Sequence, residues 1–175
     1  GKVNVFIEKD EAAMGARTAA MAAKEIMAAA DRGKLPVLWL MAAPSGFAFY
    51  TAFIDLCRRD KALASLMRRT HFFQFDDYPI GRGDPKFPIT FRSLLETYFF
   101  VPLAGVCGPL EHVELMELTG GADDDRIAAG YAARVLGVLD DKDYYVLEIK
   151  GIGMDGHWGF HGSETPLDKA PGIIK

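Results

Sequence analysis

The chain has 175 residues, of which 50% are hydrophobic, 25% charged and 11% aromatic. This composition excludes a disordered chain, a collagen and a disulfide scaffold, and the length allows one domain of about 100–200 residues, so residues 1–175 are expected to form a single domain. The net charge is −4 without a basic block, and no apolar run approaches the roughly 20 residues that span a bilayer, so neither nucleic acid nor a membrane is expected as a partner.

The first part of the chain predicts alternating strands and helices. Apolar runs and helical spacing predict a strand at Val3–Ile7, a helix at Glu11–Ala30, a strand at Val37–Met41 and a helix at Phe47–Arg59. Asp10 is a good N-cap for the first helix, which is rich in strong helix formers. Val37–Met41 is apolar throughout, as expected of a strand that is buried on both faces.

The alternation continues to the end of the recognisable pattern. The predicted elements are strands at His71–Phe75, Val113–Leu118 and Tyr144–Ile149, and helices at Thr90–Phe100 and Asp123–Leu139. Such alternation predicts an α/β fold: a mostly parallel sheet with helices on both faces, a Rossmann-like three-layer sandwich. In such sheets the ligand lies beyond the carboxyl ends of the strands.

The two cysteines, Cys57 and Cys107, show neither a metal-binding spacing nor an obvious bridge. They are expected to be free thiols in a reducing environment. The N-terminus lacks the pattern of a signal peptide. These features predict a cytoplasmic protein.

The first candidate site is the turn Ala42–Gly46, between a predicted strand and a predicted helix. Small residues there let backbone N–H groups face an anion at the positive end of the helix, and Ser45 adds a hydroxyl. The turn lacks the lysine of a P-loop, so a nucleotide phosphate loop is not expected. The alternative is an unoccupied strand-to-helix turn.

The second candidate is the pair Asp76 and Asp77, which follows a predicted strand. Adjacent carboxylates repel each other, and such repulsion raises the pKa of a carboxyl group. A carboxylate in this position can act as a general base. The alternatives are a capping or surface pair and a metal site, although neither a histidine nor a further carboxylate follows at ligand spacing.

The third candidate, Gly151–His157, is the longest motif. Its glycines allow unusual backbone angles and close approach of a ligand. Asp155 and His157 are two residues apart, so the carboxylate can orient the imidazole, and such a pair can move protons near neutral pH. The alternative is a glycine-rich turn with two exposed polar residues.

These motifs resemble the glucosamine-6-phosphate deaminase/isomerase family, over roughly residues 3–160. The family's Gly-Ile-Gly-x-Asp-Gly-His-x-x-Phe signature is present as Gly151–Phe160, and its Met-Asp-Glu-Tyr as Phe75–Tyr78. The family's Ser-Tyr-His-Ser-Phe…Asn-Phe-Phe helix is echoed by Thr90–Leu94 and Tyr98–Phe100. The related 6-phosphogluconolactonases share the Asp-Gly-His motif, whereas the other two motifs favour the deaminase branch.

The resemblance implies a sugar-phosphate substrate and an aldose–ketose isomerisation coupled to loss of ammonia. The residues that it implies for the phosphate are Ala43, Ser45 and Gly46. It implies that Asp76 moves the proton between C1 and C2. Asp77, the neighbouring carboxylate, is the next candidate for the base if Asp76 is not. It also implies that His157, oriented by Asp155, opens the pyranose ring. Neither a metal nor an organic cofactor is implied.

The sequence departs from the family in four places. The phosphate loop of the family is Gly-Gly-Thr-Pro-like, whereas here Ala43–Gly46 contains a proline that lacks an N–H donor. The family's relay glutamate is replaced by Gly162, with Glu164 two residues on. Lys150 stands where the family has a glycine, which makes Lys150 and Glu164 additional candidate site residues. Family members also continue past the position of Lys175, so a fragment or a C-terminally truncated sheet is expected.

The leading hypothesis is therefore an enzyme that acts on glucosamine 6-phosphate or a related sugar phosphate. The alternatives are a 6-phosphogluconolactonase-like hydrolase and a catalytically silent domain that binds sugar phosphates. The expected partner is the small-molecule sugar phosphate, and a homo-oligomer is compatible with the sequence.

Overall fold

Four parallel strands form the central sheet, in the order β3-β2-β1-β4. The computed structural model describes residues 3–157 and residue 159. The strands are β1 (Leu35–Leu40), β2 (His71–Gln74), β3 (His112–Glu114) and β4 (Tyr144–Ile149). Leu40 at the end of β1 is in register with both Gln74 and Ile149. The carboxyl ends of β2, β1 and β4 therefore lie side by side at one edge of the sheet.

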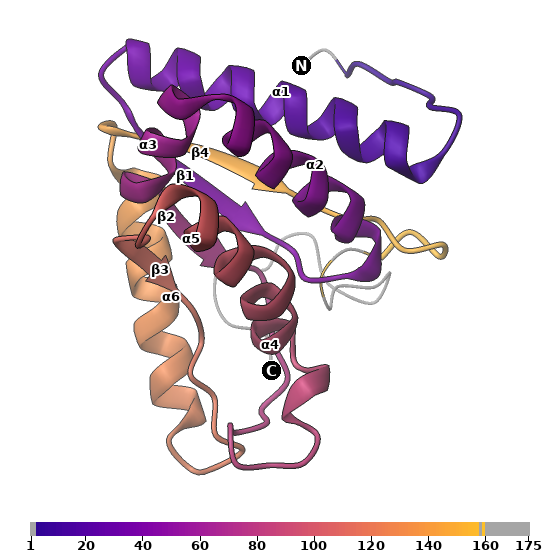
Figure 1. Ribbon diagram of the computed structural model, residues 1–175. Coiled ribbons are helices and arrows are strands. Elements are labelled where there is room, and N and C mark those ends of the chain that lie inside the picture. The colour runs from indigo at the N-terminus through magenta and orange to yellow at the C-terminus, as the bar shows by residue number, and fades with distance from the viewer. Residues whose placement is uncertain (1–2, 158, 160–175) are drawn as a thin grey trace.

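Helices cover both faces of this sheet (Figure 1). They are α1 (Glu11–Asp31), α2 (Phe47–Arg59), α3 (Lys61–Arg69), α4 (Phe91–Leu95), α5 (Val101–Cys107) and α6 (Asp124–Asp140). Side chains of α1, α2, α3 and α5 pack with Leu38 and Phe72 on one face. Side chains of α6 pack with Val37 and Phe73 on the other. The predicted α/β architecture is thus confirmed.

The larger core is aromatic and lies on the face that carries α1 and α2. Phe53, Phe72 and Phe99 are fully buried there, and the Phe99 ring, from the helix that follows α4, contacts Phe53 of α2 and Phe72 of β2. Burial of each such side chain stabilises the fold by roughly 1.5–3 kcal/mol. Cys57 belongs to this core, and both cysteines are free thiols as predicted.

Several predicted elements have the expected bounds. The structure confirms Phe47–Arg59 as α2 and Tyr144–Ile149 as β4. Asp10 caps α1, because its carboxylate accepts a hydrogen bond from the N–H of Ala13 at 2.7 Å. None of the described helices combines the length and hydrophobicity needed to cross a membrane.

The predicted strand at Val3–Ile7 is wrong. The segment pairs with no described strand, and Val3 and Ile7 are 86% and 93% exposed. It lies above α1 in Figure 1, with the sheet below that helix. An apolar run becomes a strand only where a sheet edge lies beside it, and here α1 separates the run from the sheet.

The predicted helix at Thr90–Phe100 continues further than expected. After α4 the chain makes a π-helical turn, η3 (Glu96–Phe100), and then runs on as α5. Pro102 in the first turn of α5 has no N–H to donate, and a wider turn before it accommodates that loss.

The helix α3 was not predicted from the sequence. Asp60 caps this helix, because its carboxylate accepts hydrogen bonds from the N–H groups of Ala62 and Leu63. Two short 3₁₀ turns, η1 (Pro44–Gly46) and η2 (Phe87–Ile89), complete the described elements.

β3 is shorter than the predicted strand at Val113–Leu118. The backbone of Met116 bonds to side chains instead of a strand: its N–H donates to Gln74 Oε1 and its carbonyl accepts from Arg92 Nη1. The strand therefore ends at Glu114, two residues before Met116.

Candidate active site

Three of the predicted motifs leave the sheet at the same edge. The turn 42–46 follows β1, Asp76 and Asp77 follow β2, and the glycine-rich segment follows β4. The ladder extends past the strands, since the N–H of Met41 donates to Ile149 O at 3.2 Å and the N–H of Phe75 donates to Leu40 O at 3.0 Å. The three motifs therefore begin next to one another, as the carboxyl-edge rule predicts.

The turn after β1 is wound into η1, directly before α2. The N–H of Gly46 donates to Ala43 O at 2.8 Å, and the N–H of Phe47 donates to Pro44 O. Gly46 is buried, and a Cβ at this position would lie 3.0 Å from the Tyr50 hydroxyl. Gly46 thus gives the turn room against Tyr50 and donates its own N–H within the turn.

Asp77 is a structural carboxylate. Its Oδ1 accepts from the N–H groups of Tyr78 and Phe91, both at 2.8 Å. Its Oδ2 accepts from the N–H of Arg92 at 3.0 Å and from Gln74 Nε2 at 3.1 Å. These four hydrogen bonds join the end of β2 to the start of α4.

Asp76 has different surroundings from its neighbour. Its side chain is half-buried, and no described residue donates a hydrogen bond to its carboxylate. Burial, together with the negative charge of Asp77, raises the pKa of Asp76 to about 6. A carboxyl group with this pKa can both accept and return a proton near neutral pH. Of the two aspartates, Asp76 is the one suited to general base catalysis.

The sequence did not single out Gln74, the residue that supports this turn. Gln74 Nε2 donates to the carbonyl of Asp76 at 3.0 Å. Its backbone is held by Tyr131, whose hydroxyl accepts from Gln74 N at 2.8 Å and donates to Gln74 O at 2.5 Å. Trp39 Nε1 donates to the same carbonyl at 2.9 Å. The signal in the sequence was a glutamine that directly follows two phenylalanines at the end of an apolar run.

The glycine-rich segment forms the predicted carboxylate–imidazole pair. His157 Nδ1 and Asp155 Oδ1 are hydrogen-bonded, and this bond, with the His157 N–H, holds the pKa of Asp155 below its usual value. The turn is closed by the N–H of Gly153, which donates to His157 O at 2.8 Å. The His157 ring covers Gly153 so closely that a Cβ there would overlap it. Both members of the pair are exposed to solvent.

Lys150 lies at the start of this segment. Its ammonium group pairs with Glu148 at 2.7 Å and lies 4.9 Å from the centroid of the Phe75 ring, which in turn stacks on Trp39. Lys150 is thus packed against the residue that precedes Asp76. Glu164, the other additional candidate, lies outside the described residues.

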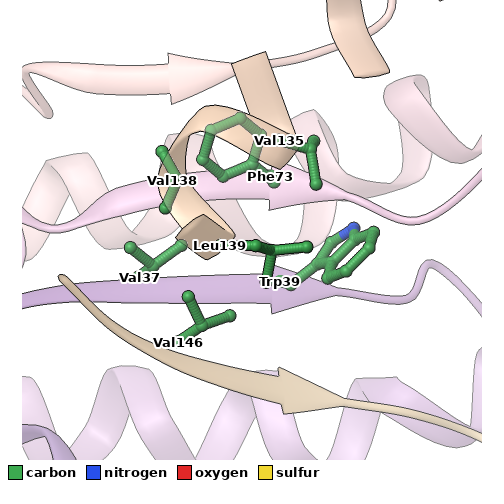
Figure 2. Close-up of a pocket in the computed structure, with 7 residues that line it drawn as sticks. All are labelled: Val37, Trp39, Phe73, Val135, Val138, Leu139 and Val146. Carbon is green, nitrogen blue, oxygen red and sulfur yellow. The ribbon is translucent and has the colours of Figure 1, made fainter. Parts of the chain in front are cut away.

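A separate apolar groove lies on the α6 face of the sheet. It is lined by Val37, Trp39, Phe73, Val135, Val138, Leu139 and Val146 (Figure 2). It contains none of the predicted site residues and offers no carboxylate or imidazole. Within the described part of the chain no group of three or more histidine, cysteine or acidic side chains could hold a metal ion.

One solved structure places this fold among known proteins. It is a monomeric glucosamine-6-phosphate deaminase, reported as a missing link of the NagB superfamily, and it is similar to this chain with a TM-score of 0.74 at 18% sequence identity. The match covers 95% of this chain and 62% of the deaminase, so the chain spans less than two thirds of that enzyme's length. Searches with the sequence match no protein-family model and no curated protein. The chain therefore has the fold of a glucosamine-6-phosphate deaminase over nearly all of its own length.

Proposed function

We propose that this chain carries the catalytic part of a sugar-phosphate isomerase or deaminase, acting on glucosamine 6-phosphate or a close relative. The observation that carries the proposal is the contrast between the two aspartates after β2. Asp77 is bonded on all sides, whereas Asp76 is half-buried with a pKa raised to about 6. The likeness to a glucosamine-6-phosphate deaminase supports the choice of substrate class.

In this proposal Asp76 is the carbon-acid base. Its carboxylate removes the proton from C2 of the open-chain amino sugar and returns it to C1, while a proton passes from the ammonium group to the C1 oxygen. The aldose thereby becomes a C2 iminium with a hydroxyl on C1. Water then adds to C2, ammonia leaves, and the ketose phosphate is the product. A raised pKa suits both halves of this transfer, because the same group must be a base and then an acid.

His157 and Asp155 act before this step. Opening the pyranose requires a proton to leave the C1 hydroxyl and a proton to reach the ring oxygen. The hydrogen bond from Asp155 fixes the orientation of the imidazole, and His157 is the group proposed to move these protons. Solvent exposure of the pair leaves room for a sugar to approach it.

The phosphate is assigned to the turn after β1. Ala43, Ser45 and Gly46 lie at the start of α2, where the helix dipole and backbone N–H groups favour an anion. Because the Gly46 N–H bonds within the turn, its part in this proposal is to let the backbone approach closely.

A second candidate is a domain that binds sugar phosphates without catalysis. The observation that favours it is in the sequence, which has Gly162 where the resembled family has its relay glutamate. A lactonase-like hydrolase is a third reading, since it would share the Asp-Gly-His turn. Its chemistry is attack of water on a carbonyl and needs no base at C2.

Product analysis separates these functions. The chain is incubated with glucosamine 6-phosphate, and ammonia and fructose 6-phosphate are measured. The proposed enzyme forms both in equal amounts, and Asp76→Asn forms neither. A folded parent chain that binds the sugar phosphate yet releases no ammonia would overturn the deaminase proposal in favour of the binding domain. Hydrolysis of 6-phosphogluconolactone without ammonia release would favour the lactonase.

A further inference from the structure

A closed set of hydrogen bonds lies next to the Asp76–Asp77 turn. Gln74 Nε2 donates to Asp77 Oδ2, and Gln74 Oε1 accepts from the N–H of Met116, both at 3.1 Å. The Met116 carbonyl accepts from Arg92 Nη1 at 3.1 Å, and the N–H of Arg92 donates back to Asp77 Oδ2 at 3.0 Å. We call Gln74, Asp77, Arg92 and Met116 the Gln74 network. It joins the end of β2, the start of α4 and the segment after β3.

This network is buried at a cost to stability. Gln74 is 0% exposed and Arg92 is 1% exposed. Burial of an amide and of a guanidinium is unfavourable unless every group finds a partner, and Arg92 Nε has none among the described residues. Arg92 recovers part of this cost through Glu117 Oε2 at 2.6 Å and the Phe87 ring at 4.9 Å. Apolar side chains of similar volume would fill these positions at a lower cost.

The network acts on the backbone around Asp76. Gln74 Nε2 also bonds the Asp76 carbonyl, and the Asp77 carboxylate is held by α4, so the peptide group that joins Asp76 to Asp77 and the side chain of Asp77 are fixed. The Asp76 carboxylate is left without a donor from the described residues. Among the described residues, the charged group that acts on this carboxylate is Asp77, in the same turn.

We propose that the Gln74 network positions Asp76 for proton transfer, with Gln74, Asp77 and Arg92 as positioning residues. This inference rests on the proposed function, because it assigns these residues to the proposed base. Asp77 does two things in this arrangement. Its oxygens accept hydrogen bonds from Gln74 and from N–H groups of α4. Its negative charge lies next to the Asp76 carboxylate, which takes the proton.

The consequence for Asp76 can be measured without substrate. The charge of Asp77 is a cause, after burial, of the raised pKa of Asp76. Asp77→Asn keeps the size of the side chain and removes this charge. The pKa of Asp76 should then fall from about 6 towards its ordinary value of 3.8.

The test combines carbon-13 NMR titration of Asp76 with amide hydrogen exchange at Phe91, Arg92 and Met116. The variants are Asp77→Asn, Arg92→Met and Arg92→Lys. The matched control is Arg126→Met, which removes an exposed arginine that pairs with Asp123 at 3.4 Å. Circular dichroism checks that each variant is folded, and Arg92→Lys carries the comparison if Arg92→Met does not fold.

We expect Asp77→Asn to lower the pKa of Asp76 and Arg92→Met to speed exchange at Met116. We expect Arg92→Met to lower kcat by up to about 100-fold with KM unchanged, and Arg92→Lys to restore part of both. An Asp76 pKa that stays near 6 in Asp77→Asn, or exchange in Arg92→Met equal to that in Arg126→Met, would overturn the inference. Because titration and exchange need no turnover, an inactive parent chain would refute the proposed function and leave this test standing.

Discussion

Two adjacent aspartates illustrate how far surroundings decide the role of a residue. The sequence preferred Asp76 to Asp77 through the family resemblance alone, because adjacent carboxylates in a turn have no pattern that separates them. The contacts of the folded chain give a physical difference, since α4 and Gln74 bond to the carboxylate of Asp77 and not to that of Asp76. Gln74 and Arg92 were also missed, because Met116, which bonds to both of them, is distant in the sequence.

The raised pKa of Asp76 predicts a gain in stability when its charge is removed. The folded-state pKa of about 6 lies above the ordinary 3.8, so the folded chain binds more protons in this window and loses stability as the pH rises through it. Asp76→Asn should therefore be more stable than the parent at pH 7.5, by about 1 kcal/mol after allowance for solvent screening, and equal to it at pH 3.5. Urea unfolding at the two pH values measures the difference.

Asp77→Asn is the matched comparison for this prediction. The asparagine amide keeps one acceptor oxygen, so two of the four hydrogen bonds are lost, which should lower the free energy of unfolding at pH 7.5 by roughly 1–3 kcal/mol. Equal effects of the two substitutions would contradict the different roles of the two aspartates.

The close contact between Gly153 and the His157 ring predicts an effect on ring opening. A methyl group there would overlap the His157 ring, and because that side chain is exposed, the ring would move and its hydrogen bond to Asp155 would break. We expect Gly153→Ala to slow turnover of the cyclic sugar as much as His157→Gln does, and to spare an open-chain analogue. Gly137→Ala is the control, because no atom lies within 4 Å of an added Cβ there. An unchanged rate in Gly153→Ala would show that the pair is not needed for ring opening.

At the scale of elements, local pattern predicted most helices and strands because their signals are local. Asp10 caps α1, and the apolar run of β1 is buried, as their sequences indicate. Val3–Ile7 carries the same apolar signal as β1, but α1 lies between it and the sheet. The end of β3 also escaped prediction, because distant side chains bind the backbone of Met116.

Two histidines on the neighbouring strands β2 and β3 should make the stability of the fold depend on pH. The rings of His71 and His112 stack at 4.0 Å, with Glu114, Tyr144 and Arg134 as the other groups of the cluster. Burial, and then the charge of His112, lower the pKa of His71 below its ordinary 6.5. The unfolded chain therefore binds the proton first, and stability that is present above pH 6.5 is lost as the pH falls below it.

His71→Gln should remove part of this dependence. We expect the melting temperature of the parent to fall more between pH 7.5 and 5.5 than that of His71→Gln, measured by circular dichroism. A variant that melts with the same pH dependence as the parent would show that His71 does not titrate on unfolding.

For the molecule as a whole, the sequence predicted the layers and the carboxyl edge because alternation of strands and helices leaves few arrangements. The strand order β3-β2-β1-β4 brings three motifs from three neighbouring strands to one edge. The similar deaminase has the same fold at 18% identity, which shows how little of the sequence is needed to specify these layers.

Assignment of the phosphate to the turn 42–46 predicts selective stabilisation of the whole fold. A ligand that binds only the folded state at a hundred times its Kd adds about 2.7 kcal/mol to stability. We expect glucosamine 6-phosphate to raise the melting temperature, and glucosamine at the same concentration to leave it unchanged. Equal shifts for the two sugars would contradict a phosphate site at the start of α2.

The proposed function depends above all on the transfer of a proton from C2 of the sugar to Asp76. The most direct test is incorporation of deuterium from solvent, followed by NMR at C2 of the recovered glucosamine 6-phosphate and at C1 of the ketose formed. The parent chain should exchange the C2 proton faster than buffer, and Asp76→Asn, which keeps the shape of the side chain but not its basicity, should exchange it no faster than buffer. A folded parent that exchanges no faster than buffer, or an Asp76→Asn variant that exchanges as fast as the parent, would contradict it.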